Sequence, residues 1–198
     1  SDTPIEGVLR EAASAPGLRQ TETLSFNSMV RAGESLRLGD LRALGEGFPL
    51  RGQFLLLDPA TGAERVAEGV PAPGTAWLSR AGADALAAKV GDRIGVGNIE
   101  LTLAALVVQE PDAALDYFNT APRLFFNLAD LEATGLVQPG SRIGYRLVVA
   151  GEPGAVEAFT ATVRDNLGRG QRLETAGEAR PEIRRALDRA DRFLGLAA

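Results

Sequence analysis

Paired carboxylates are the residues of this chain best suited to chemistry, because two neighbouring acids can divide the roles of general acid and general base. The pairs are Glu64 with Glu68 and Glu174 with Glu178, and neither has a neighbouring base or Gly-rich loop. The sequence contains no His and no Cys, which excludes Ser-His-Asp and Cys-His nucleophiles and the usual zinc sites. No run resembles an EF-hand loop or a P-loop, although an all-carboxylate site for Mg²⁺ or Ca²⁺ remains open. We therefore expect a protein that is not an enzyme and uses no cofactor or metal.

Two short apolar stretches are instead candidates for contact with a partner, because they stand in polar, turn-forming surroundings. One is the pair Tyr117 and Phe118 in "ALDYFNTAP". The other is the trio Phe48, Pro49 and Leu50 between Gly-containing turns, whose alternative and favoured role is to fill the junction between two lobes. The runs at Trp77 and at 124–126 are expected in the core, since they lie in predicted strands.

Composition limits the class of partner. The 198 residues are 45% hydrophobic and carry a net charge of −5. A negative chain without a concentrated basic face is a poor ligand for phosphates, so we expect no nucleic-acid partner. No stretch reaches 18 consecutive apolar residues, and the chain opens on a helix start rather than a targeting segment.

The first part of the chain predicts a helix and then strands. Asp2 or Thr3 would be the N-cap of a helix that ends at Pro16-Gly17. Partial period-two alternation between 24 and 41 predicts two strands joined by a turn at Gly33, and 53–57 predicts a short third strand. Residues 58–75 are rich in Gly, Pro and charge, which predicts an exposed connection.

The middle of the chain predicts a compact β-rich unit. A strand at 76–79 leads to a helix at 80–88, and "KVGDRIGVGNIELTLAALVV" then predicts a strand, a Gly turn and a strand. "RLFFNL" at 123–128 predicts a further strand, followed by a short helical turn.

The last part predicts a β-α-β-α order. The alternation of Ile143, Tyr145, Leu147 and Val149 predicts a strand, and a helix with one apolar face follows from 153 and ends before Gly168. "QRLETA" at 171–176 predicts a short strand. The terminal helix starts near Pro181, and its apolar face includes Ile183, Leu187, Phe193 and Leu194, with no polar residue to end it.

These elements predict an α+β fold with two lobes. Residues 1–57 and 113–198 would form an α/β lobe from both ends of the chain, and residues 58–112 would form an inserted β-rich lobe. Both termini would then lie together, each on a helix.

Five segments resemble one protein family, and the resemblance extends over nearly the whole chain, from about residue 2. They are "EGFPLRG" (46–52), "GVPAPGTAWLS" (69–79), "ALAAKVGDRIGVGNIELTLAALVVQEPD" (85–112), "APRLFFNLADLEATGLVQPGSRIGYRLVVAG" (121–151) and "ARPEIRRALDRADRFLGLAA" (179–198). The chain resembles the extracytoplasmic domain of FtsX-like ABC transporter permeases, of the MacB periplasmic core type, and within that group the YbbP type. The stretch 121–151 is the most specific part of the resemblance.

The resemblance implies a place and a fold. The parent would be an inner-membrane permease with one membrane helix just before Ser1 and another just after Ala198, and this domain would lie in the periplasm. The α/β lobe would be membrane-proximal, and the β-rich lobe would be inserted into it.

The resemblance also implies a mechanism and partners. A separate cytoplasmic ATP-binding subunit would hydrolyse ATP, and stalk helices would carry the motion to the periplasm. There it would extract or export a hydrophobic or envelope substrate, or act on an envelope partner. The stalks would be 2–14 and 181–198, with Pro181, Ile183, Leu187, Phe193 and Leu194 on the lever. A helix of about 18 residues is about 27 Å long and stiff enough to transmit a tilt.

Two alternatives remain open at this point. One is a permease domain of the lipoprotein-release type, with the same architecture. The other is a free-standing periplasmic adaptor domain whose terminal helix docks on a partner.

Overall fold

The computed structural model describes residues 1, 3–59, 61–111, 122–138 and 140–175. Its helices and strands are, in chain order, α1 (Gly7–Ala13), β1 (Leu18–Ala32), β2 (Ser35–Leu44), β3 (Leu55–Leu57), β4 (Glu64–Val66), β5 (Thr75–Ser79), α2 (Arg80–Leu86), β6 (Arg93–Val96), β7 (Ile99–Gln109), β8 (Arg123–Asn127), a 3-10 turn η2 (Leu128–Asp130), α3 (Leu131–Thr134), β9 (Gly144–Gly151) and α4 (Pro153–Asp165). The predicted α+β class is confirmed.

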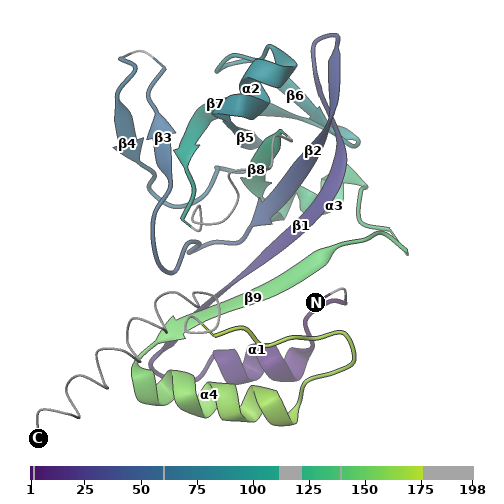
Figure 1. The fold of residues 1–198 in the computed structure, drawn as a ribbon. Helices are drawn as coiled ribbons and strands as arrows, with labels where there is room; N and C mark the ends of the chain where they lie inside the picture. The colour runs from purple at the N-terminus through teal and green to yellow at the C-terminus, as the bar shows by residue number, and fades with distance from the viewer. Residues whose placement is uncertain (2, 60, 112–121, 139, 176–198) are drawn as a thin grey trace, which may run out of the picture.

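Six of the strands close into a ring (Figure 1). β1 pairs with β2, β2 with β8, β8 with β5, β5 with β7, β7 with β6, and β6 pairs back with β1. The β2–β8 and β5–β7 pairs are parallel and the others are antiparallel. Closure satisfies the backbone donors and acceptors on both sides of most of these strands, which an open sheet would leave exposed at its edges.

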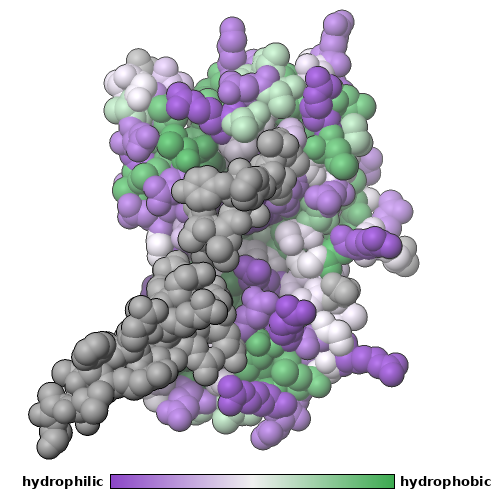
Figure 2. Space-filling view, in the orientation of Figure 1, coloured by the Kyte–Doolittle hydropathy of each residue, from purple (hydrophilic) through white to green (hydrophobic). Residues whose placement is uncertain are grey.

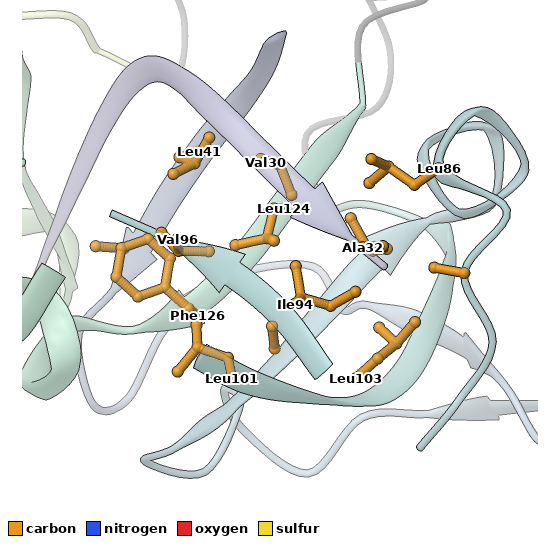
Figure 3. Close-up of a cluster of buried hydrophobic side chains, with 14 of the residues drawn as sticks. Val30, Ala32, Leu41, Leu86, Ile94, Val96, Leu101, Leu103, Leu124 and Phe126 are labelled. Atoms are coloured by element: carbon orange, nitrogen blue, oxygen red, sulfur yellow. The ribbon is translucent and has the colours of Figure 1, made fainter. Parts of the chain in front are cut away.

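The main hydrophobic core fills the inside of this ring. Successive strand residues point to opposite faces, so each strand sends every second side chain inward. Figure 3 shows Leu41, Ile94, Leu124 and Phe126 among the side chains that meet there, and each of these is fully buried. Leu86 of α2 belongs to the same cluster, so α2 packs against the core.

A second cluster covers the outer face of the ring. Phe125 points outward and packs edge-on against Phe54, with ring centroids 5.2 Å apart. Trp77 meets the same Phe54 ring at 5.5 Å. The expected core positions at Trp77 and at 124–126 are therefore confirmed, but they divide between the two faces of the ring.

The third cluster lies between sheet and helices at the other end of the molecule. Residues 18–25 of β1 pair with β9, and α1 and α4 lie side by side against this pair (Figure 1). Ile5 and Leu9 of the N-terminal segment pack with Val163 of α4, and Tyr145 and Leu147 of β9 add to the cluster. We call α1, α4, β9 and residues 18–25 the terminal layer. Within the described residues, the N-terminal helix and the segment from β9 to α4 thus meet in one α/β layer, and the predicted contribution of residues 176–198 to it stays a prediction.

Local chemistry explains the sharp turn between β6 and β7. Gly97 has a φ of +57°, which favours glycine, and a Cβ there would lie 2.1 Å from the carbonyl oxygen of Thr134. Gly97-Asn98 is thus the two-residue loop of a hairpin.

Three local expectations were wrong. Thr3 does not cap α1: the helix begins at Gly7 after Glu6, without a capping side chain, and Asp2 lies outside the described residues. The predicted strand at 171–176 is irregular backbone over its described part, where it pairs with none of the described strands. The connection 58–75 contains a strand that the sequence did not predict, β4, which pairs with β3.

The predicted lobe boundaries at 57/58 and 112/113 stay a prediction. The two boundaries divide the strands of the ring between the predicted lobes. β5, β6 and β7 belong to 58–112, whereas β1, β2 and β8 lie outside that range, and all six form one closed sheet.

The ring core should dominate stability. Replacing Phe126 by Ala removes a fully buried ring and leaves a cavity, so we expect the free energy of unfolding in urea to fall by about 3–5 kcal/mol. The control is Val66→Ala on β4, whose side chain is 50% exposed, and its effect should stay within about 0.5 kcal/mol. Equal losses for both variants would contradict this assignment of the core.

Candidate partner-contact site

The predicted contact residues Phe48, Pro49 and Leu50 lie between β2 and β3. Phe48 is half-buried, with its ring centroid 6.1 Å from that of Phe54, and it packs on the outer cluster of the ring. Leu50 is only 9% exposed, and its carbonyl accepts a hydrogen bond from Arg19 at 3.4 Å. The Phe48–Pro49 peptide bond is cis. A partner could thus reach Phe48 and Pro49 more readily than Leu50.

The other predicted site residues lie outside the described residues. They are the contact candidates Tyr117 and Phe118 and the lever residues Pro181, Ile183, Leu187, Phe193 and Leu194. Their roles stay predictions.

Phe48 also borders a small cavity on the outer face of the sheet, where the ring meets the terminal layer. The cavity has a volume of about 110 Å³. Leu44, Phe54 and Phe125 make its apolar side, and Arg42 and Arg146 add charge. Ligand sites for small molecules usually measure about 300–1,000 Å³, so this space suits a single side chain.

A network of four charges lies beside the cavity. Arg123 donates to Glu110 at 2.7 Å, and Arg42 donates to the other oxygen of Glu110 at 3.4 Å. Asp40 accepts from Arg42 at 3.3 Å and lies 3.6 Å from Nε of Arg123. The side chain of Arg123 is 9% exposed, and those of Glu110 and Asp40 are 12% and 16% exposed. Two positive and two negative charges therefore compensate one another where water has little access.

Sequence reasoning did not identify this network. Asp40 and Arg42 share a strand face, which their spacing of two residues could have shown. Glu110 directly follows β7 and Arg123 begins β8, and the parallel pairing of β2 with β8 brings Arg123 beside Asp40. No local pattern signals such a distant pair.

The charged groups of the network are already paired with one another. Glu110 accepts hydrogen bonds from Arg42 and Arg123, and Asp40 accepts one from Arg42. Among the residues that the structure describes, no group of three or more acids is placed to hold a metal ion.

The terminal layer offers the second surface of interest. Arg10 of α1 makes a two-pronged ion pair with Glu22 of β1, its Nη2 donating to Oε2 at 2.9 Å. This hydrogen bonding with Glu22 raises the pKa of Arg10 above its ordinary value. Figure 2 shows hydrophobic surface over the helices of this layer, and Val8 of α1 is 46% exposed. Across the described ranges, we find no helix with the length and apolar character needed to cross a membrane.

The chain is similar to known proteins of one class, although no family model matches it. It is 31% identical over 188 residues to the uncharacterized ABC transporter permease YbbP of Escherichia coli (strain K12). This match covers 95% of the chain but spans only 22% of the length of YbbP. Among solved structures, the chain resembles the extracellular domain of the noncanonic ABC-type transporter YknZ from Gram-positive bacteria, with a TM-score of 0.55 and 9% identity. That match covers 81% of this chain and 83% of the YknZ domain, and it confirms the fold.

The buried network should matter more for stability than exposed ion pairs do. Arg123→Met leaves Glu110 and Asp40 without their most buried partner, and we expect unfolding in urea to become easier by about 3 kcal/mol. The matched control is Arg93→Met, which breaks an exposed pair with Glu100 and should cost less than about 1 kcal/mol. Similar losses in both variants would show that burial adds nothing to this network.

Proposed function

This chain is a relative of the ABC transporter permeases with the fold of an extracellular domain from that group, and on this basis we propose that it transmits ATP-driven motion of membrane helices to the cell envelope. The observation that carries the proposal is the terminal layer. Both ends of the described chain enter one packed unit, so forces applied at the two ends meet in the same place.

The path from the terminal layer to the ring is continuous. β1 is 15 residues long; its first part pairs with β9 in the terminal layer, and its last part pairs with β2 and β6 in the ring. Residues 23–25 pair with β9 on one side and β2 on the other. A strand hydrogen-bonded in this way resists stretching and bending, whereas a flexible loop would absorb the motion.

The ring suits the receiving end of this path. Its strands close on themselves around a packed core, so it moves as one body and not strand by strand. Motion of β1 would therefore move the whole surface of the ring.

The two relatives support a proposed setting for this role. The parent permease lies in the inner membrane with this domain in the periplasm, and the terminal layer faces the membrane. A separate cytoplasmic subunit binds and hydrolyses ATP, and the domain itself catalyses no reaction. The motion extracts or exports a hydrophobic or envelope substrate, or acts on an envelope partner.

Fluorescence quenching in a membrane tests both the orientation and the motion. A fluorophore on Ala158→Cys, exposed on α4, and one on Val66→Cys, exposed on β4 and away from α4 in Figure 1, are introduced separately into the parent permease. This chain has no native Cys, and cysteines elsewhere in the parent are replaced. The permease and its ATP-binding subunit are placed in lipid nanodiscs with quenchers on the headgroups.

We expect stronger quenching at Ala158→Cys than at Val66→Cys, and a change in quenching when a non-hydrolysable ATP analogue binds. Stronger quenching at Val66→Cys would contradict the proposed orientation, because β4 would then lie nearer to the membrane than α4. If nucleotide binding changes the quenching at neither site, the proposed mechanical role is wrong.

A further inference from the structure

Over residues 35–38, between the turn at Gly33 and Asp40, the outer edge of β2 has no paired strand in the described part of the chain. On one side β2 pairs with β1, down to Ala32 opposite Ser35. On the other side its pairing with β8 begins only at Asp40. Among the described residues, none pairs with this edge before Asp40.

The strand pairing shows which backbone N–H and C=O groups of β2 point toward this edge. The N–H of Asp40 donates outward, to the carbonyl of Pro122 at 2.8 Å, so Asp40 faces away from β1. Outward groups recur at every second residue of a strand, and those of Leu36 and Leu38 therefore also point to the open edge. These groups match the donors and acceptors of an added strand.

The side chains beside this edge form an exposed apolar patch. Leu38 lies directly opposite Met29, and Leu36 lies opposite Arg31 on the same face. Met29, Leu36 and Leu38 are 45%, 49% and 58% exposed. Large apolar side chains gathered beside an open strand edge are typical of a surface that binds another strand.

Charge distinguishes between possible occupants. Arg37 is exposed, and its Nη1 donates to the carbonyl of Leu36 at 2.9 Å; in the described part of the chain it has no carboxylate partner. In a pair of two such edges that matches Leu36 with Leu38 of a second copy, Arg37 would oppose Arg37, which is unfavourable. An acidic residue in a different partner would instead draw the guanidinium away from the Leu36 carbonyl and free that acceptor.

We propose that the edge of β2 at Leu36–Leu38 binds an extended segment of an envelope protein by strand addition. The segment carries apolar residues two apart, which face Met29, Leu36 and Leu38, and an acidic residue between them, which pairs with Arg37. In Figure 1 the hairpin formed by β1 and β2, with its turn at Gly33, lies at the end of the molecule away from α1 and α4. The inference deepens the proposed function by giving the kind of partner, and depends on it only for the partner's place in the envelope.

Peptide titration of the 198-residue chain tests the binding, followed by NMR of backbone amides. The probes are acetyl-Thr-Val-Glu-Val-Thr-amide and the same peptide with Lys at its centre. We expect the Glu peptide to bind about two- to fivefold more tightly than the Lys peptide, with the largest shifts at the amides of Leu36 and Leu38. Because the test needs no membrane or ATP, its failure is distinguishable from failure of the proposed function.

Variants decide whether this edge is the site. Arg37→Glu keeps the fold, since its side chain is exposed, and should reverse the preference in favour of the Lys peptide. Leu38→Pro removes one outward N–H and should abolish binding of both peptides. The matched control is Arg65→Glu on β4, a short exposed strand at the edge of the sheet, which should leave the preference unchanged.

Several results would overturn the inference. They are the absence of shifts at Leu36 and Leu38, a preference reversed by Arg65→Glu and not by Arg37→Glu, and amides of Leu36 and Leu38 that are protected from solvent exchange by another part of this chain. A concentration-dependent dimer that competes with the peptides would assign the edge to a second copy.

Discussion

The hydrogen bonding of β1 is the constraint on which the rest of the structure depends. Its 15 residues are too many for one partner, so β1 pairs with β2 along most of its length, with β9 at its start and with β6 at its end. The β6 pairing closes the ring, and the β9 pairing holds the terminal layer. A single strand thus joins the two packed units that the proposed function couples.

Closure of the ring also explains the distribution of its side chains. The side chains that point into the ring core are apolar and buried, so the outward-pointing side chains are left to contact other elements. Phe125 and Trp77 hold the β3–β4 hairpin there, while Asp40 and Arg42 hold β8 and the end of β7 through ion pairs. Before Asp40, where the pairing with β8 begins, no described strand pairs with the outer edge of β2, and Leu36 and Leu38 are exposed there.

Local patterns predicted most of the elements, because they arise from near neighbours. Alternation predicted the strands around Gly33 and at 144–151, and an apolar face predicted α4. β4 escaped prediction since all three of its residues are exposed and show no alternation. The segment 171–175 alternates weakly but pairs with no strand among the described residues, and its backbone is irregular.

By itself, the sequence determined the α+β class, the absence of His and Cys chemistry, the core character of Leu124–Phe126 and the similarity to ABC transporter permeases. These follow from composition and from residues close together in the chain. Only the tertiary structure decided that six strands close into a ring, that Arg123 joins Glu110 to Asp40, and that no described strand pairs with the edge at Leu36 and Leu38. The physical reason is that strand pairing joins residues far apart in the chain, so which edges are covered is decided only when all strands are in place.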